Sequence, residues 1–398
     1  MITRHLAATL KRSASHYPVL TVTGPRQSGK TTLVRSLFGK HTYVSLEAPD
    51  IREFAAEDPR GFLGQFDRGV VLDEVQRVPN LFSYIQGIVD AEDKPGQFVL
   101  TGSQNFLLLQ QVSQSLAGRT SVFHLLPFSR AELEAREPLP IKDIGRALPK
   151  RKPGQANLFQ TLFAGSYPRI HDKGLDPQEW LRNYYQTYIE RDVRSILNVG
   201  DIETFGRFVR LCAGRTGQML NLSSLGADCG VSHATAKRWL AVLEASFIVY
   251  LLRPYHKNFS KRLVKSPKLY FLDTGLLCYL LRIRSVDELV THSSRGAVFE
   301  TFVLTELLKS YLNQGLEPDV HFWRDSAGNE VDLVLDHGME LVPIEIKSGE
   351  TIAADFFKGL QYWRSLPGQK DCPAALVFGG GTSMKRQEAM VYSWHHWL

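Results

Sequence analysis

The sequence predicts an α/β protein built from more than one domain. In residues 1–136, short apolar segments typical of buried strands alternate with amphipathic segments typical of helices. Strands that alternate with helices form a parallel sheet covered by helices. The 398 residues also exceed one ordinary hydrophobic core, and a mostly helical stretch separates this region from a second α/β region.

The expected elements follow from the apolar patterns. In residues 1–136 we expect strands at Val19–Thr23, Thr42–Leu46, Gly69–Leu72 and Phe98–Thr101, and a helix at Lys30–Phe38. Residues 137–156 are rich in Pro, Lys and Arg and are interpreted as a linker or exposed excursion. Residues 157–290 form the helical domain, with helices at Leu181–Leu197, Leu222–Cys229 and His233–Ala245 and a strand at Phe247–Leu252. Residues 291–398 form the last domain, with helices at Gly296–Leu312 and Asp355–Leu366 and strands at Val320–Trp323, Glu330–Leu335, Leu341–Lys347 and Ala374–Phe378.

Composition narrows the class of protein. The chain is 43% hydrophobic and 22% charged, so wholesale disorder is not expected. Its net charge of +6 fits contact with nucleic acid without proving it. The four cysteines have neither C-x-x-C spacing nor a nearby His, which argues against a zinc site or disulfides and fits a reducing compartment. No apolar run is long enough for a signal peptide or a membrane span, so we expect a soluble cytoplasmic protein without a membrane partner.

A glycine-rich loop follows the first predicted strand and opens a helix. The pattern G-x-x-x-x-G-K-[ST] lets the backbone N–H groups face phosphate oxygens, adds a lysine for the β and γ phosphates, and offers a hydroxyl to magnesium. The strand–loop–helix setting separates a true phosphate-binding loop from a chance match. It predicts ATP and Mg²⁺ as cofactors, with ATP contacted by Gly24, Pro25, Arg26, Gln27, Ser28, Gly29, Lys30, Thr31 and Thr32.

A buried strand that ends in two carboxylates completes this site. Val70–Leu72 is apolar and is followed by Asp73 and Glu74. We expect Asp73, together with Thr31, to hold Mg²⁺, and Glu74 to act as general base on the attacking water.

Two further elements are expected near the γ-phosphate. Polar residues follow the strand Phe98–Thr101, and ligands gather at the carboxyl ends of strands in open α/β sheets. Ser103, with Gln104 or Asn105 as alternatives, is a candidate sensor of the γ-phosphate. Arg119 is a candidate catalytic residue that stabilises developing charge, in cis or from a neighbouring subunit. A surface arginine is the competing interpretation of Arg119.

The region Leu222–Leu252 looks like a winged helix-turn-helix. Its second helix begins after Ser232, a favourable N-cap residue, and would be the recognition helix. The candidate DNA-binding residues are Lys237 and Arg238 on that helix and Lys261 and Arg262 in the wing. The alternative is a packing module that does not touch DNA.

A predicted β-hairpin in the last domain gathers carboxylates and a lysine. Strand alternation places Glu330 and Asp332 on one face of the first strand, and Glu345 and Lys347 on one face of the second. Asp332 and Glu345 would bind a divalent cation, and with Lys347 they would activate water for attack on a phosphodiester. The competing interpretation is a hairpin with solvated charges.

These motifs resemble known families. The loop, the Thr-Gly-Ser that ends the fourth strand, Leu-Ala-Gly-Arg119 and Tyr188–Asp192 resemble prokaryotic AAA-type P-loop ATPases. The likeness is closest to a group with a winged-helix middle region and a nuclease-like C-terminal domain. The hairpin is similar to the PD-(D/E)XK nuclease fold, with Glu330-Val-Asp332 in place of Pro-Asp. That resemblance implies an α/β restriction-endonuclease-like domain in which Glu300 is a further metal ligand and Gln361 a supporting residue.

The expected function is that of an ATPase acting on DNA, possessing a metal-dependent nuclease-like domain. The alternative is a nucleotide switch that binds a protein or DNA partner without cutting, and a transcription regulator is a third interpretation. An arginine acting in trans would require a homo-oligomer, whereas action in cis is compatible with a monomer.

Overall fold

The structure is a computed structural model that describes residues 2–92, 94–102, 112, 115–150, 154–187, 202–255, 266–386 and 389–398. The chain divides into two compact units, which we describe separately. The first comprises Met1–Phe128, Ala245–Phe247 and Tyr311–Leu316, and the second comprises Ser129–Glu244, Ile248–Ser310 and Glu317–Leu398. Within the described ranges, every helix is too short or too polar to cross a lipid bilayer.

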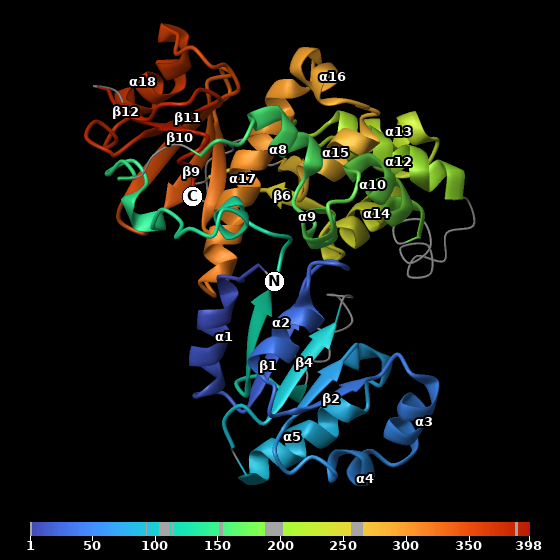
Figure 1. Ribbon diagram of the computed structural model, residues 1–398. Helices are drawn as coiled ribbons and strands as arrows, with labels where there is room; N and C mark the ends of the chain where they lie inside the picture. Colours follow the sequence, from blue (N-terminus) through green and yellow to red (C-terminus); the bar gives the residue numbers. More distant parts are fainter. Residues whose placement is uncertain are drawn as a thin grey trace. The chain divides into compact units, whose positions relative to one another are not determined.

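The first unit contains a five-stranded parallel sheet in the order β2–β3–β4–β1–β5, shown in the lower part of Figure 1. Its strands are β1 (Val19–Thr23), β2 (Thr42–Ser45), β3 (Val70–Asp73), β4 (Phe98–Gly102) and β5 (Thr120–His124). The predicted parallel sheet is therefore confirmed, with the four expected strands within one residue of their predicted ends and with β5 in addition. Because the strands are parallel, their carboxyl ends share one edge, and β4 lies between β1 and β3.

Helices cover both faces of this sheet. On one face, Leu6, Leu10, Leu33 and Val34 from the first two helices pack against side chains of β1, β3, β4 and β5. On the other face, the next three helices pack against Val70, Leu72 and Leu100 among others. The helices of this unit are α1 (Leu6–Ala14), α2 (Lys30–Leu37), α3 (Pro49–Glu57), α4 (Pro59–Leu63), η1 (Val75–Arg77) and α5 (Leu81–Glu92).

The second unit contains a six-stranded mixed sheet in the order β12–β13–β11–β10–β9–β8. Its strands are β8 (Val320–Arg324), β9 (Glu330–Asp336), β10 (Leu341–Lys347), β11 (Ala375–Phe378), β12 (Met384–Lys385) and β13 (Met390–Ser393). β9 and β10 form the predicted antiparallel hairpin. One face is covered by η4 (Ala354–Phe357) and α18 (Lys358–Ser365), whose Leu360 and Trp363 enter the core.

The rest of the second unit is mostly helical. Its further elements are α7 (Arg130–Leu133), η2 (Ile141–Asp143), α8 (Leu158–Ala164), α9 (Pro168–Lys173), α10 (Pro177–Tyr184), α12 (Ile202–Gly214), α13 (Leu222–Cys229), α14 (His233–Ala245), β6 (Val249–Leu252), β7 (Lys268–Phe271), α15 (Thr274–Leu280), α16 (Val286–Thr291) and α17 (Arg295–Asn313). Both predicted helices of the helix-turn-helix have the expected bounds. The second half of the helix expected at Leu181–Leu197 lies outside the described residues.

Part of the segment 137–156 is packed inside the second unit. Leu139, Ile141 and Ile144 are buried. The hydroxyl of Tyr392 on β13 donates a hydrogen bond to the carbonyl of Ala147 (2.9 Å) and accepts one from the backbone N–H of Gly145 (2.9 Å). Three spaced apolar side chains were too weak a pattern to predict this packing from the sequence.

Candidate functional site

The loop between β1 and α2 is bent at residues with positive φ. Gly24 has φ +148°, and a Cβ there would lie 2.2 Å from the carbonyl oxygen of Leu125, so only glycine fits. Gly29, with φ +91°, caps α2, and Gln27 adopts φ +63° although it is not glycine. A strained residue of this kind at a predicted ligand loop is typical of a functional site.

The side chain of Lys30 is buried inside this loop. It is 6% exposed, and its Nζ donates to the carbonyl oxygens of Gly24 (3.0 Å) and Pro25 (2.8 Å). Burial lowers the pKa of Lys30 to about 8, and the nearby carboxylates of Glu74 and Asp73 oppose that shift. Among the described residues, the loop thus holds a cation whose hydrogen bonds go to the neutral carbonyls of Gly24 and Pro25.

Asp73, at the carboxyl end of β3, accepts hydrogen bonds from three neighbouring elements. Its Oδ2 accepts from Thr31 Oγ1 (2.9 Å) and from the hydroxyl of Tyr43 on β2 (2.8 Å), and its Oδ1 accepts from Thr101 Oγ1 on β4. A hydrogen bond therefore links Thr31 and Asp73, the two residues that the sequence predicts as ligands of Mg²⁺. Sequence reasoning missed Tyr43 and Thr101, although polar residues near the ends of strands flanking β3 were an available signal.

Glu74 and Arg4 complete the surroundings of the loop. Glu74 has a left-handed backbone (φ +56°) directly after β3, and its carboxylate accepts a hydrogen bond from the side-chain amide of Gln76. Arg4 is 7% exposed and donates to the carbonyls of Ser28 (2.7 Å) and Leu126 (2.6 Å). It ties the loop to the end of β5. A lone arginine before the first helix gave no sequence signal for this role.

Arg119 lies at the opposite edge of the sheet from the loop. It precedes β5, and its carbonyl accepts from the N–H of Val19, whereas the loop follows Thr23 at the other end of β1. Its guanidinium pairs with Asp90 of α5. Five strand residues span roughly 15 Å. Of the two roles considered for Arg119, this position favours action in trans over action in cis, and the catalytic role of Arg119 stays a prediction. Ser103, Gln104 and Asn105 lie outside the described residues.

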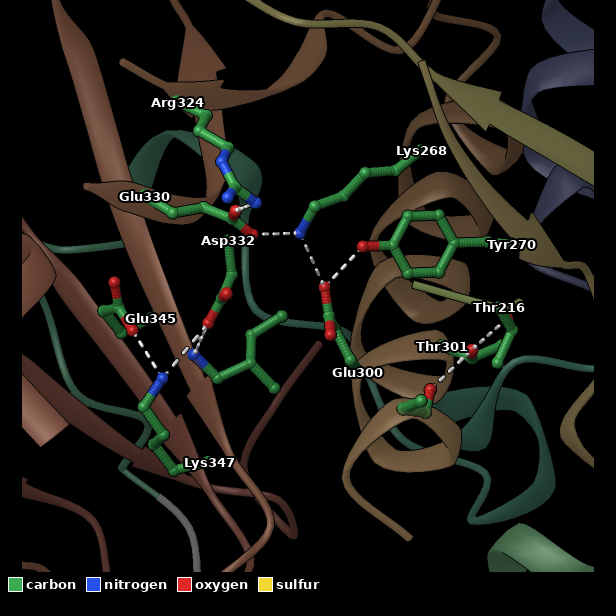
Figure 2. A network of polar contacts seen from close by, with 12 residues as sticks. Thr216, Lys268, Tyr270, Glu300, Thr301, Arg324, Glu330, Asp332, Glu345 and Lys347 are labelled. Atoms are coloured by element: carbon green, nitrogen blue, oxygen red, sulfur yellow. Dashed lines mark hydrogen bonds and ion pairs between the residues drawn. The ribbon is translucent and has the colours of Figure 1, made fainter. Parts of the chain in front are cut away.

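The hairpin of the second unit brings Asp332, Glu345 and Lys347 together. The register pairs Ile344 with Leu333, which places Glu345 opposite Asp332. Lys347 Nζ lies 2.6 Å from Glu345 Oε2 and 3.5 Å from Asp332 Oδ2. Figure 2 shows the lysine pointing toward these two carboxylates. Burial, and then the Asp332 carboxylate, raise the pKa of Glu345 to about 8.

The absence of a side chain at Gly359 leaves the space that the Glu345 carboxylate occupies. A Cβ on Gly359, in the first turn of α18, would lie 2.0 Å from Glu345 Oε1 and 2.7 Å from the carbonyl oxygen of Glu330. The helix therefore packs directly over the carboxylate, and Glu345 is only 4% exposed. Sequence reasoning missed this constraint.

Comparisons with known proteins agree with the nucleotide-site geometry. Residues 16–134 match the family described as AAA domain, and residues 155–287 and 295–397 each match a domain of unknown function (DUF8612 and DUF4143). Uncharacterized proteins of Mycobacterium bovis and Mycobacterium tuberculosis are each 31% identical over 353 residues, covering 87% of this chain and 74% of theirs. The chain belongs to the family of these mycobacterial proteins, and its residues 16–134 form a domain of the AAA type.

Solved structures give weaker likenesses. A Walker-type ATPase of Pyrococcus abyssi is 14% identical, with 71% of this chain and 96% of that one covered and a TM-score of 0.43. The RuvB Holliday junction branch migration motor of Thermotoga maritima is 18% identical, with 62% and 87% covered and a TM-score of 0.28. Scores this low carry no argument about function.

In the second unit, Glu300 does not join the carboxylates of the hairpin. Its Oε1 accepts from the hydroxyl of Tyr270 and lies 3.5 Å from Lys268 Nζ, both on β7, whereas Glu345 points to Lys347 (Figure 2). Within the described ranges, no group of three or more His, Cys, Asp or Glu side chains is arranged to hold a metal ion. Glu300 is paired with a lysine from another element, and its expected role as a metal ligand stays a prediction. Gln361 is exposed on α18.

The middle region of the chain has the local features expected of a helix-turn-helix. Gly230 (φ +73°) ends α13, and Ser232 Oγ accepts from the N–H of Thr235 (3.1 Å), as predicted for an N-cap. Lys237 and Arg238 are exposed on α14, while Trp239 on the same helix is buried against Phe205 and Phe208 of α12. β6 and β7 pair in antiparallel fashion, and Lys261 and Arg262 lie outside the described residues.

Proposed function

We propose that this ATPase uses Mg²⁺-dependent ATP hydrolysis to control a metal-dependent nuclease-like site that acts on DNA. The observation that carries the DNA-directed part is the convergence of Asp332, Glu345 and Lys347 on one hairpin. Burying carboxylates beside an ammonium group costs folding free energy. Such groups cluster at functional sites, which favours a chemical role for these residues.

For ATP hydrolysis, the geometry supports distinct roles. Lys30 would contact the β and γ phosphates, replacing its bonds to loop carbonyls, while Thr31 and Asp73 offer adjacent oxygens for Mg²⁺. A water oxygen bonds to the γ-phosphorus as the bond to the β–γ bridging oxygen breaks, and Glu74 accepts the proton of that water. Tyr43 and Thr101 orient Asp73 through their hydrogen bonds.

For phosphodiester cleavage, the residues fit one divalent cation. Asp332 and Glu345 face each other across the hairpin, and burial followed by the Asp332 carboxylate raises the pKa of Glu345 although Lys347 opposes that shift. A bound Mg²⁺ or Mn²⁺ would polarise the scissile phosphate. Lys347 would stabilise charge on the attacking water oxygen, which displaces a sugar oxygen from phosphorus.

DNA would be bound by the middle region, which we interpret as a winged helix. The order of elements is that of a winged helix, with helices α13 and α14 followed by the paired strands β6 and β7. Met219, before α13, forms an isolated β-bridge with Lys268 of β7. Lys237 and Arg238 project from α14 into solvent and are free to contact phosphates.

The second candidate function is a nucleotide switch that binds a protein or DNA partner without cutting. It is favoured by the pairing of Glu300 with Lys268, which takes one acidic residue out of the expected ligand set. In that case the hairpin serves assembly, and ATP binding controls complex formation.

Plasmid cleavage with Mg²⁺ or Mn²⁺ separates these two functions. We expect nicking by the wild type, its loss in Glu345→Gln and in Lys347→Met, and no change in Glu350→Gln, whose carboxylate is exposed just after the hairpin. Lys30→Ala, assayed with and without ATP, shows whether hydrolysis gates cleavage. An inactive wild type that still hydrolyses ATP, or nicking that persists in Glu345→Gln, would reject the nuclease in favour of the switch.

A further inference from the structure

A buried ammonium group lies among carboxylates beside the candidate nuclease hairpin. Lys268, the first residue of β7, is 3% exposed, and its Nζ lies 2.5 Å from Glu330 Oε1 and 3.5 Å from Glu300 Oε1. Glu330 lies two residues before Asp332 on β9, so the two carboxylates share a face of that strand. In Figure 2, Asp332 stands between the Lys268 group on one side and Glu345 with Lys347 on the other.

Lys268 is surrounded by carboxylates, as a bound metal cation would be. Glu300, Glu330 and Asp332 all act on it electrostatically, and they raise its pKa although burial works in the opposite direction. Arg324 forms an ion pair with Glu330, at 2.9 Å from its Oε2. Glu300 has a raised pKa, chiefly from burial, and Lys268 is the counter-charge that opposes this shift. A desolvated ammonium held in this way is a fixed positive charge.

We propose that Lys268 is a built-in cation of the nuclease-like site, filling a position beside Asp332 that a divalent ion would otherwise take. The site therefore accepts one divalent cation at most, bound by Asp332 and Glu345, and Glu300 binds Lys268 instead of metal. This inference rests on the proposed metal-dependent function for its biological meaning, but not for its test, which measures ion binding.

A purely structural role is the competing explanation. Lys268 joins β7 to β9 and α17, and the loss of one partner from a buried ion pair costs about 3–5 kcal/mol whatever its function. A structural cross-link predicts that a variant without the ammonium is destabilised equally with and without metal. A built-in cation predicts that a divalent ion replaces it.

The first experiment counts bound Mn²⁺ in the nucleotide-free protein by electron paramagnetic resonance of the free ion. The count for wild type minus that for Asp332→Asn isolates this site, because the ATP site is the same in both proteins. We expect a difference of one ion. A difference of two would overturn the proposal, even if no Lys268 variant can be purified. A difference of zero would reject the proposed metal-dependent cleavage while remaining compatible with a cation position already filled by Lys268.

The second experiment removes the ammonium group from this position with Lys268→Met. We expect this variant to bind one more Mn²⁺ than wild type, and its unfolding midpoint to rise by roughly 5 °C more than that of wild type in saturating Mn²⁺. The double variant Lys268→Met/Glu300→Gln restores the charge balance and should lose the extra ion. Lys358→Met, which removes an exposed lysine at the start of α18, is the matched control. An unchanged ion count in Lys268→Met would overturn the proposal.

Discussion

The two candidate sites differ in where their positive charge comes from. In the nucleotide site, Lys30 is the first residue after the loop and its ammonium group lies inside that loop. Asp73, at the end of β3, accepts a hydrogen bond from Thr31 in the same helix as Lys30. In the hairpin site, Lys347 is part of the hairpin, but Lys268 lies 62 residues (330 − 268) before its first residue, Glu330.

This difference decides how much of each site can be recognised from a motif. A phosphate-binding loop carries its cation, its turns and its helix end within one segment. A hairpin motif supplies carboxylates, but the cations that balance them depend on tertiary packing. Glu300 illustrates the point, because its helix was predicted within one residue at each end while its partners Lys268 and Tyr270 were not foreseen.

The largest expected effect tests whether the two sites are separable. Lys30→Ala should lower the ATP hydrolysis rate by roughly 100- to 1000-fold, because charge developing on the γ-phosphate loses its cation. Lys40→Ala, which removes an exposed lysine just after α2, should have the wild-type rate. Mn²⁺ binding attributable to Asp332 should be unaffected by Lys30→Ala. Loss of both functions in this one variant would show that the sites are not independent.

The next effect tests the backbone of the loop. Gly24→Ala places a Cβ against the Leu125 carbonyl at a φ of +148°, so we expect a loss of about 3 kcal/mol in unfolding free energy. Gly87→Ala is the matched change, because that glycine lies in α5 with open space around it, and it should be neutral or slightly stabilising. Urea denaturation measures both. Equal effects of the two changes would show that the Leu125 contact does not constrain the loop.

The pKa of Lys30 predicts the pH dependence of nucleotide binding. Burial lowers that pKa to about 8, so in the free protein the lysine loses its charge as the pH rises through 8. ATP affinity should then fall by up to about tenfold per pH unit. Between pH 8 and 10.5 the unfolded chain binds more protons at this lysine than the folded chain, so the contribution of Lys30 to stability rises with pH there.

Calorimetric titration with a non-hydrolysable ATP analogue between pH 7 and 9.5 measures this dependence. Lys30→Ala is the control, and its weaker binding should not vary with pH over this range. A wild-type affinity that stays constant above pH 8 would mean that the lysine keeps its charge in the free loop.

Elements of the fold could be predicted where the sequence signal was local. Prediction failed where the structure depends on packing between distant segments. Val19–Thr23 and Leu341–Lys347 were predicted at their observed bounds because each is a strongly apolar strand next to clear turn signals. β5 was missed because Thr120, Ser121 and His124 leave only two apolar residues in it. Without β5 there was no means of knowing that Arg119 directly precedes a parallel strand, and hence lies at the edge away from the loop.

The smallest effect tests the polar residues that sequence reasoning missed in the nucleotide site. Thr101→Val removes the buried hydroxyl that donates to Asp73 Oδ1 and keeps the shape of the side chain. We expect about a fivefold lower hydrolysis rate, which corresponds to a hydrogen bond of about 1 kcal/mol, and a higher Mg²⁺ requirement. Thr21→Val is the matched change, because Thr21 is equally buried on the adjacent strand β1 but bonds to Thr120 instead. A steady-state assay across Mg²⁺ concentrations separates the two, since only Thr101→Val should raise the Mg²⁺ concentration needed for half-maximal rate. If both variants behave alike, Thr101 stabilises the sheet and does not orient the carboxylate.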